Sequence, residues 1–485
     1  MATEGFSKNL GYLFTMLGCA IGLGSLWKGP ALFYANGGGA FLIPFFVAMI
    51  IMGIPVFILE TQLGVMTRSA FPLAMKKLHK KAEFIGWYSC AGGIVVTAYY
   101  TIIIGYCLDY IYEAARLSWG IKPEQYFNEN VLMLSSGVFD LGGIAPKAAI
   151  AGALIFGATY IIMSKGLQGG LEKANSVFIP GLLVLSIAVL IRAVTLPGAI
   201  DGLILFVTPD FSALLKPQVW VMAFTLVTFL TSVGMGIATT MGAYTAKGTD
   251  VVKNSLIVCL GVMGYALMMA TASFGIIGYV AHTTGLPLAE CVAGGFKLAF
   301  SVYPTATSAM PWLNSLFGVA FFLTAVFAGL SSSLAFFEAV PAALAEKFKL
   351  NKVKASKNTV LFSAATSIIF VTGAGLYWTD IVDRYVCTWV MMATVLLEVP
   401  IMMKYMGIDK MRVAINESTS LKLGKWFNYI IPVSALSVLG LLVMDAISLT
   451  GGLYGGYPLS AQLLGIGYIM VFVALGYILY RMPQR

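Results

Sequence analysis

Ser331 and Ser332 lie in a strongly apolar run, three and four residues after Ala328. In a helix this spacing places all three residues on one face. Hydroxyl groups on such a face can bind a cation, but a stripe of small residues can equally serve close packing between membrane helices. From this segment alone, packing is the simpler interpretation.

A second unusual feature is the glycine-rich stretch GCAIGLGSLWKGPALFYANGGGAF, which runs from Gly18 to Phe41. Gly22 and Gly24 lie two positions apart, and each glycine costs a helix about 1 kcal/mol relative to alanine. A break at Gly22–Ser25 would free carbonyl and amide groups near the centre of a bilayer, where unsatisfied groups are costly. Ions and a polar substrate could satisfy these groups, and the half-helix ends would add partial charges that favour them.

The elements that must carry these residues are membrane helices. The chain of 485 residues is 59% hydrophobic and only 11% charged, whereas a soluble domain carries about 25% charged residues. About twelve apolar runs reach the length of about 18 residues that a spanning helix needs. The sequence therefore predicts an all-α integral membrane protein with a single membrane domain over residues 1–485. The predicted spans lie at 9–34, 40–66, 84–115, 147–164, 171–193, 217–245, 251–281, 313–346, 357–374, 380–404, 427–448 and 460–481.

The charges agree with a membrane location. The net charge is +9, and basic residues gather in KKLHKK (76–81), EKFKLNKVKASK (346–357) and KMR (410–412). With the N-terminus inside, all three segments fall in cytoplasmic loops, as the positive-inside rule requires. The lipid bilayer rather than a nucleic acid thus explains the basic excess, and both termini are expected in the cytoplasm. The six cysteines show neither metal-site spacing nor a disulfide pattern.

A second interruption follows five spans after the first. The segment TLVTFLTSVGMGIATTMGAY (225–244) places Ser232, Gly234 and Gly236 in mid-membrane. Two interrupted helices an odd number of spans apart have opposite orientations, which is typical of an inverted repeat with a binding site at the midplane. The sequence therefore predicts inverted repeats at approximately 9–193 and 217–404, with additional helices at approximately 427–481.

Several motifs together resemble the neurotransmitter:sodium symporter family, which includes the bacterial leucine transporter. Besides the glycine-rich first span, they are ILETQLG (58–64), VVTAYY (95–100), TPDFSALLKPQVW (208–220), FAGLSSSLAFFE (327–338) and TDIVDRY (379–385). Their order, spacing and number match the family along most of the chain. The resemblance implies the leucine-transporter (LeuT) fold, a five-plus-five inverted repeat in which helices 1 and 6 are broken. It also implies symport by alternating access rather than an enzymatic reaction. The loop 116–146 contains no glycosylation sequon, which favours the inner membrane of a bacterial or archaeal cell.

The resemblance further implies a bound sodium ion. Its ligands would be the carbonyls of Gly18, Ile21 and Ala328 and the hydroxyls of Ser331 and Ser332. Five oxygen ligands without a carboxylate suit a monovalent hard cation better than calcium or magnesium.

The second sodium site of the family is not matched. Ser25, Leu230 and Val262 stand where the family has asparagine, threonine and asparagine, and Ala266 stands at its chloride or carboxylate position. Leucine and valine side chains cannot ligate a cation. We therefore expect coupling to one sodium ion and no dependence on chloride.

By position, the resemblance predicts a substrate pocket between spans one, three, six and eight. Gly22 occupies the position where monoamine carriers place an aspartate, so an amine without a carboxylate would lack its counter-ion. The amides of Leu23 and Gly24 and the Tyr100 hydroxyl could hold a carboxylate, which favours a neutral amino acid with an apolar side chain. The predicted lining residues are Cys19, Ala20, Leu23, Gly24, Val96, Tyr100, Phe229, Leu230, Ser232, Met235, Ser332 and Phe336.

The same resemblance predicts gates on both sides of the pocket. Lys28 and Asp383 would close the extracellular side, with Tyr100 and Phe229 as the inner lid. On the cytoplasmic side Thr3 stands where the family has an arginine, so Lys8 is the expected partner of Glu346.

Two other functions remain open from the sequence. Glu338 or Glu60, acids inside predicted spans, could couple amino-acid transport to protons instead of sodium. The motif GLSS (329–332) weakly resembles the serine motif of an intramembrane protease, which needs a histidine base within reach. His79 lies in a basic loop and His282 at a membrane edge, so neither is placed for that chemistry.

Overall fold

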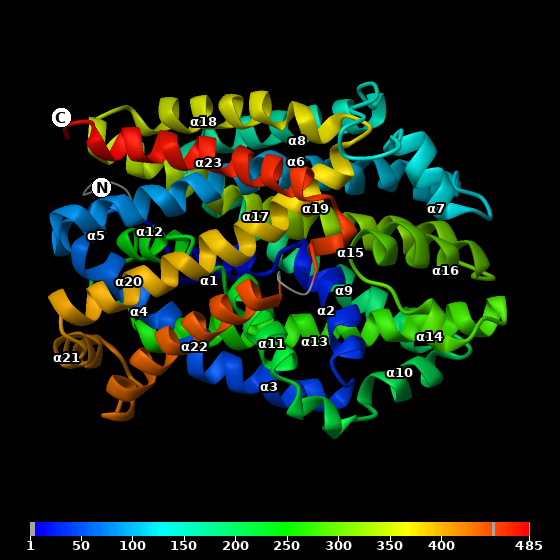
Figure 1. Cartoon of the computed structure of the whole chain (residues 1–485), viewed down its shortest axis with the longest axis horizontal. Helices are drawn as coiled ribbons and strands as arrows, with labels where there is room; N and C mark the ends of the chain where they lie inside the picture. Colours follow the sequence, from blue (N-terminus) through cyan, green and yellow to red (C-terminus); the bar gives the residue numbers. More distant parts are fainter. Residues whose placement is uncertain (1–4, 449–451, 485) are drawn as a thin grey trace.

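The computed structural model of the chain describes residues 5–448 and 452–484. In this part of the chain the regular structure is helical, and the long helices run roughly along one axis of the molecule (Figure 1). Nine helical segments of the described chain are long and apolar enough to cross a membrane. A tenth span is formed by α1 (Asn9–Ala20) and α2 (Leu23–Ala35), which are bent by 46° at the break between them.

The nine continuous segments contain most of the helices. They are Gly39–Thr67 with α3 (Leu42–Ala48) and α4 (Ile54–Thr67), Lys80–Arg116 with α6 (Glu83–Arg116), α8 (Pro146–Met163), Leu167–Val194 with α9 (Lys173–Val194), α13 (Val251–Thr284), α17 (Asn314–Phe348), Gly375–Tyr405 with α19 (Gly375–Tyr385) and α20 (Met392–Tyr405), α22 (Trp426–Ser448) and α23 (Leu459–Arg481). Short π-helical turns at Met49–Gly53 and Val386–Met391 join α3 to α4 and α19 to α20.

Two further predicted spans do not form continuous apolar helices of membrane length among the described residues. The predicted span 217–245 is split into α11 (Pro217–Thr231) and α12 (Ile237–Ala243). The predicted span 357–374 corresponds to α18 (Lys352–Thr366), which has a polar start, followed by a 3-10 turn at Ser367–Val371. α18 lies beside α8 and α17 (Figure 1). The prediction of an all-α membrane protein is confirmed.

Proline and glycine residues set several helix boundaries. Pro146 and Pro217 occupy the first turns of α8 and α11, where their missing N–H groups cost no hydrogen bond. Gly285, with a φ angle of 73°, ends α13.

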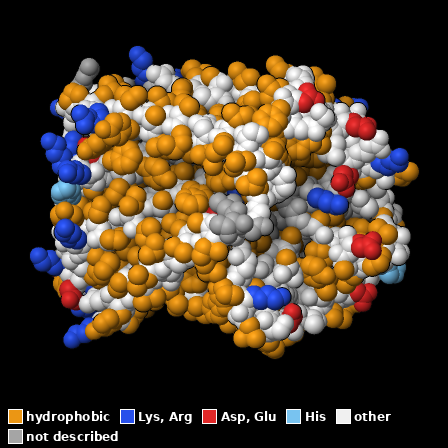
Figure 2. Space-filling model, in the orientation of Figure 1, with side chains coloured by type: hydrophobic (Ala, Val, Ile, Leu, Met, Phe, Trp, Pro, Cys, Tyr) orange, Lys and Arg blue, Asp and Glu red, His pale blue; other side chains and the backbone are white. Residues whose placement is uncertain are grey.

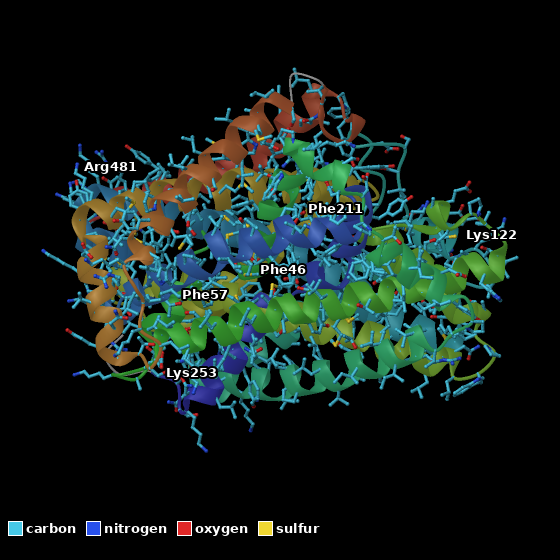
Figure 3. All side chains as sticks on the ribbon, turned by 90° about the horizontal axis from the view of Figure 1, so that it is seen from below. Phe46, Phe57, Lys122, Phe211, Lys253 and Arg481 are labelled. Atoms are coloured by element: carbon cyan, nitrogen blue, oxygen red, sulfur yellow. The ribbon has the colours of Figure 1, made fainter. Side chains whose placement is uncertain are left out.

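Shorter helices cover the two ends of the molecule. α5 (Phe71–Leu78) and α21 (Ile408–Ser418) lie at the end that carries both termini, and α7 (Pro123–Tyr126), α14 (Leu288–Cys291) and α16 (Tyr303–Ala309) lie at the opposite end (Figure 1). α10 (Ala199–Val207) and α15 (Gly295–Lys297) complete the set. Lys253 and Arg481 mark the first end and Lys122 the second (Figure 3). Figure 2 shows lysine and arginine side chains gathered at the end that carries the termini.

The centre of the molecule is formed by α6 and α17. In the most apolar part of each helix, 89% of the α6 residues and 78% of the α17 residues are buried inside the protein. Both the broken pair α1–α2 and the broken pair α11–α12 lie against this centre, and α1 packs directly on α17. The fold therefore brings the two interrupted spans to the most deeply buried helices.

Candidate functional site

The first span breaks at Ile21 and Gly22. The Gly22 amide donates to the Ala20 carbonyl at 3.1 Å, and the Ser25 amide donates to the Gly22 carbonyl at 3.1 Å. In an unbroken helix these two amides would donate to the carbonyls of Gly18 and Ile21. The break is therefore shorter than the predicted Gly22–Ser25, and it releases two of the carbonyl groups that the family resemblance assigns to sodium.

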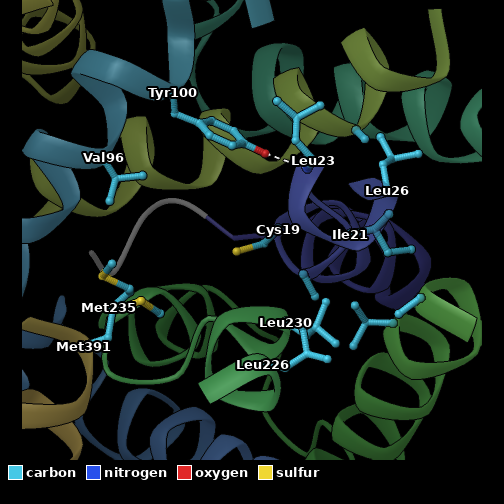
Figure 4. Close-up of a cluster of buried hydrophobic side chains, with 14 of the residues drawn as sticks. Cys19, Ile21, Leu23, Leu26, Val96, Tyr100, Leu226, Leu230, Met235 and Met391 are labelled. Atoms are coloured by element: carbon cyan, nitrogen blue, oxygen red, sulfur yellow. Dashed lines mark hydrogen bonds between the residues drawn. The ribbon is translucent and has the colours of Figure 1, made fainter. Parts of the chain in front are cut away.

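A side chain from α6 holds this break open. The Leu23 amide, which in a continuous helix would bond the Cys19 carbonyl, donates to the Tyr100 hydroxyl at 2.8 Å (Figure 4). Tyr100 is buried, so this bond is shielded from water. The start of α2 and the middle of the third span are thus joined at the site.

The sixth span breaks at residues 232–236, between α11 and α12. Ser232, Gly234 and Gly236 have positive φ angles of 53°, 78° and 65°, a conformation that glycine adopts without a Cβ penalty. The Gly234 amide donates to Glu60 Oε1 at 2.7 Å, and the Gly234 carbonyl accepts from the Ser89 hydroxyl at 3.0 Å. Buried side chains of the second and third spans therefore satisfy part of the backbone at this break.

Both breaks border a narrow cavity between α1, α6, α11, α17 and the Val386–Met391 turn. About 40 Å³ of the cavity is open to the centre of a water molecule, which is room for a few waters. Its wall is mostly apolar, with a few hydroxyl and thiol groups and one carboxyl group. The lining residues are Cys19, Ala20, Gly22, Val96, Tyr99, Tyr100, Phe229, Ser232, Met235, Ser332, Phe336, Asp383, Cys387 and Met391.

Three residues of the predicted pocket lie behind this wall. Leu23 contributes its amide to Tyr100, Gly24 packs against the ring of Phe229, and Leu230 is almost fully buried. The remaining predicted residues all line the cavity, namely Cys19, Ala20, Val96, Tyr100, Phe229, Ser232, Met235, Ser332 and Phe336.

Sequence reasoning missed part of the wall. Cys387 and Met391 reach the cavity from the π-helical turn Val386–Met391, which has no recognisable sequence signal. Tyr99 and Asp383 line it as well. Asp383 is predicted from TDIVDRY as a gate residue and not as part of the pocket wall, and Tyr99 is the neighbour of Tyr100 in VVTAYY.

The residues assigned to sodium meet where α1 contacts α17. A Cβ atom at Gly18 would lie 2.9 Å from Ser331 Cβ, and one at Gly22 would lie 3.1 Å from Ser332 Oγ. The Ser331 hydroxyl donates to the Ala328 carbonyl at 3.0 Å. This contact offers carbonyl and hydroxyl oxygen atoms, which is the ligand chemistry that a monovalent hard cation needs.

The region of the expected second cation is apolar. Leu226 and Leu230 extend from α11 toward α1 (Figure 4), and Leu230, Val262 and Ala266 are all buried. Of the residues at the family's second sodium site, only Ser25 carries a hydroxyl group. This buried hydroxyl has no hydrogen-bond partner among the described residues.

Lys28 and Asp383, the residues predicted to form the outer gate, are in contact. Lys28 Nζ lies 2.6 Å from Asp383 Oδ2 and 4.1 Å from the centre of the Phe229 ring. The Tyr99 hydroxyl donates to Asp383 Oδ1 at 2.8 Å. The side chains of Lys28 and Asp383 keep exposed fractions of 34% and 25%, and Asp383 also lines the cavity.

The predicted pairing of Glu346 with Lys8 is wrong. Glu346 Oε2 accepts the Ala70 amide at 2.8 Å and so caps the start of α5, and Lys8 is exposed. A carboxylate at a helix N-terminus is stabilised by the amides there, which explains the different partner. Thr3 lies outside the described residues.

Both acids considered for proton coupling, and one of the two histidines considered for a protease, have structural partners. Glu338 forms a salt bridge with Lys352 at the start of α18, and Glu60 holds the break at Gly234. His79 stacks on the ring of Tyr405 with centroids 4.8 Å apart. Neither His79 nor His282 lines the cavity, so the geometry offers Ser331 and Ser332 no histidine base.

Comparison with known proteins identifies the family. The sequence profile of the sodium:neurotransmitter symporter family matches residues 3–122 and 118–483. The chain belongs to this family.

Relatives in the family are transporters that depend on sodium. The chain is 38% identical over 483 residues to an uncharacterized sodium-dependent transporter of Methanocaldococcus jannaschii, covering 99% of this chain and 98% of the relative. It is 29% identical to a sodium- and chloride-dependent GABA transporter 2 of Bos taurus, covering 79% of this chain and 69% of the relative. The protein is thus a membrane transporter of a sodium-dependent family and not an enzyme.

Substitution Lys28→Gln tests whether the salt bridge closes the cavity of this transporter. Removing the ammonium group leaves Asp383 without its cation, although the Tyr99 hydroxyl still donates to it. A salt bridge of this kind is worth about 1 kcal/mol, so we expect Cys387, which lines the cavity, to react about fivefold faster with a polar thiol reagent. Mass spectrometry of the labelled protein in detergent measures the rate at each cysteine.

The matched control is Lys297→Gln. Lys297 pairs with Glu124 at 3.7 Å, with side-chain exposed fractions of 60% and 56%, and its loss should leave the labelling of Cys387 unchanged. Equal labelling rates in Lys28→Gln and the unmodified protein would show that the pair does not close the cavity.

Proposed function

We propose that this transporter couples uptake of a neutral amino acid with an apolar side chain to the entry of sodium. The observation that supports it is the meeting of two helix breaks at one small, largely apolar cavity. Freed carbonyls attract a cation and freed amides attract an anion, so a compact site can hold an ion beside a zwitterion.

The chemistry of the wall favours a substrate with both charges. The start of α2 presents the positive end of a half-helix, and the Tyr100 hydroxyl lies beside it, so a carboxylate fits there. Carbonyls at the ends of α1 and α11 can accept an ammonium group. Asp383 is the one acidic side chain lining the described cavity, and Lys28 binds it. A lone amine would therefore lack a free counter-ion, whereas GABA, for which one relative is named, also carries both charges.

Uptake into proteoliposomes tests the substrate class. With an inward sodium gradient, we expect labelled leucine or other apolar amino acids to enter at least tenfold better than the matching amines without a carboxylate. The reason is the loss of charge-assisted hydrogen bonds, each worth about 1.5–3 kcal/mol. Preference for the amines would refute the proposed substrate.

We further propose that Gly18, Ile21, Ala328, Ser331 and Ser332 hold the coupled sodium ion. The meeting of Gly18 with Ser331 and of Gly22 with Ser332 supports this arrangement. Because the ion would join α1 to α17, its arrival and departure would favour different positions of the first span.

Substitutions Ser331→Ala and Ser332→Ala test the sodium site. Each removes one hydroxyl ligand, so the sodium concentration for half-maximal substrate binding should rise by about tenfold or more. Ser333→Ala is the matched control, since Ser333 is buried in the same run but its hydroxyl donates to the Leu330 carbonyl at 3.1 Å. Unchanged sodium titrations in both site variants would remove these serines from the site.

We also propose coupling to one sodium ion without chloride. Support comes from Leu230, Val262 and Ala266, which leave the second position without oxygen ligands apart from Ser25. The relative from Bos taurus is named as chloride-dependent, so this chain would differ from it in ion use.

Reversal potentials in proteoliposomes measure the stoichiometry. We expect one sodium per substrate, a sodium Hill coefficient near one, and unchanged uptake when chloride is replaced by gluconate, because the apolar side chains cannot bind a second ion. A ratio of two would mean that Ser25 and backbone carbonyls build the second site by themselves.

A second candidate is proton coupling through Glu60. Glu60 and Glu398 are both fully buried, and their carboxyl groups are neighbours. Buried acids inside membrane spans often belong to proton pathways. Uptake driven by a pH gradient without sodium would favour proton coupling through Glu60. Glu338 is a weaker candidate for the proton-coupling acid, because it forms a salt bridge with Lys352.

For orientation, we propose that both termini face the cytoplasm across the inner membrane. The basic side chains at the end of the molecule that carries the termini support this (Figure 2). The inverted repeats 9–193 and 217–404 within one membrane domain are part of the same proposal, supported by breaks in the first and sixth spans.

A further inference from the structure

Asn175 is an unexplained polar residue in the first turn of α9. Its side chain is fully buried, and neither its Oδ1 nor its Nδ2 atom has a hydrogen-bond partner among the described residues. A buried amide without a partner is unfavourable, because it has lost its bonds to water. A group of this kind indicates that something outside the chain completes its hydrogen bonding.

The amide oxygen of Asn175 lies against Gly18, one of the residues of the proposed sodium site. A Cβ atom at Gly18 would lie 2.8 Å from Asn175 Oδ1, 2.9 Å from Ser331 Cβ and 3.1 Å from Ile179 Cδ1. Asn175 and Ile179 are four residues apart, so one face of α9 lies against Gly18. Asn175 and Ser331 therefore flank the same residue of α1, one from α9 and one from α17.

Another buried asparagine shows what a structural role looks like in this protein. Asn254 of α13 exchanges two hydrogen bonds with Asn9, at 3.2 Å and 2.8 Å. Asn175 has no comparable partner in the described structure, although it is buried even more deeply. Packing alone would be served equally well by an apolar residue of the same shape.

We propose that Asn175 contributes its Oδ1 atom as a further ligand of the sodium ion, a proposal that rests on the sodium site proposed above. A carboxamide oxygen is a neutral hard ligand of the same class as the carbonyls and hydroxyls already assigned. It adds a third helix, α9, to a site otherwise built from α1 and α17. Occupation of the site would then tie the fifth span to the first and the eighth.

The experiment compares Asn175→Leu and Asn175→Asp with the unmodified protein. Leucine keeps the number and branching of the side-chain heavy atoms and removes both polar atoms, and aspartate keeps a side-chain oxygen at the same position. Binding of radioactive sodium is measured by equilibrium titration in detergent without substrate, and the melting temperature is followed over the same sodium concentrations, because a bound ion stabilises the folded state by mass action.

We expect Asn175→Leu to bind sodium about tenfold more weakly, while its melting temperature without sodium stays equal or rises. Asn175→Asp should bind sodium more tightly than Asn175→Leu. The matched control is Thr159→Val on α8, because the Thr159 hydroxyl is also fully buried without a partner in the described structure but is not among the nearest neighbours of Gly18. Its sodium titration should match that of the unmodified protein.

Ser332→Ala in the same titration separates the two proposals. If Ser332→Ala weakens sodium binding and Asn175→Leu does not, Asn175 is a packing residue and the inference is overturned. If neither variant changes the titration, the proposed sodium site itself is wrong. If Asn175→Leu does not fold, Asn175→Asp is compared with Asn175→Ser, whose shorter side chain lacks the carbonyl oxygen. Equal sodium affinity in these two variants would overturn the role of Asn175.

Discussion

A peptide group inside a membrane protein must find a hydrogen-bond partner, because neither lipid nor an apolar core supplies one. Both helix breaks of this chain expose such groups. Tyr100, Glu60 and Ser89 satisfy some of them from neighbouring helices. The carbonyls of Gly18 and Ile21 lose the amides that a continuous helix would supply. The proposed binding site is therefore the part of the broken backbone that the protein's own side chains leave available.

The same constraint explains where the charges lie. A full charge inside the cavity would need a partner there, since an isolated charge away from water is strongly unfavourable. Lys28 supplies that partner for Asp383, which lines the cavity, and both side chains stay partly exposed. The deeper contact between α1 and α17 carries only neutral oxygen atoms. A ring of neutral ligands holds a monovalent cation without the strong attraction of carboxylates, which suits a site that must also release its ion.

The sequence predicts this site well where local chemistry decides and poorly where packing decides. Gly22 and Gly234 mark the two breaks because no other residue type is so unfavourable in a helix and so tolerant of irregular backbone. Leu230 lies in the predicted segment but turns away from the cavity, and Cys387 enters it because a π-helical turn changes the register of the tenth span. Glu346 caps α5 instead of binding Lys8. The start of α5 approaches Glu346 only through tertiary packing, which the spacing of residues along the sequence does not reveal.

The apolar second position has an energetic consequence for transport. A zwitterion carries no net charge, so only the coupled ions move charge across the membrane. Each charge is worth about 2.3 kcal/mol per 100 mV, which by itself supports roughly a fiftyfold accumulation of substrate. With Leu230 and Val262 in place of oxygen ligands, the carboxylate of the proposed amino-acid substrate would have no neighbouring cation there. In this proposal the amides at the start of α2 and the Tyr100 hydroxyl carry the whole attraction for that carboxylate, so the break in the first span would decide both ion and substrate binding.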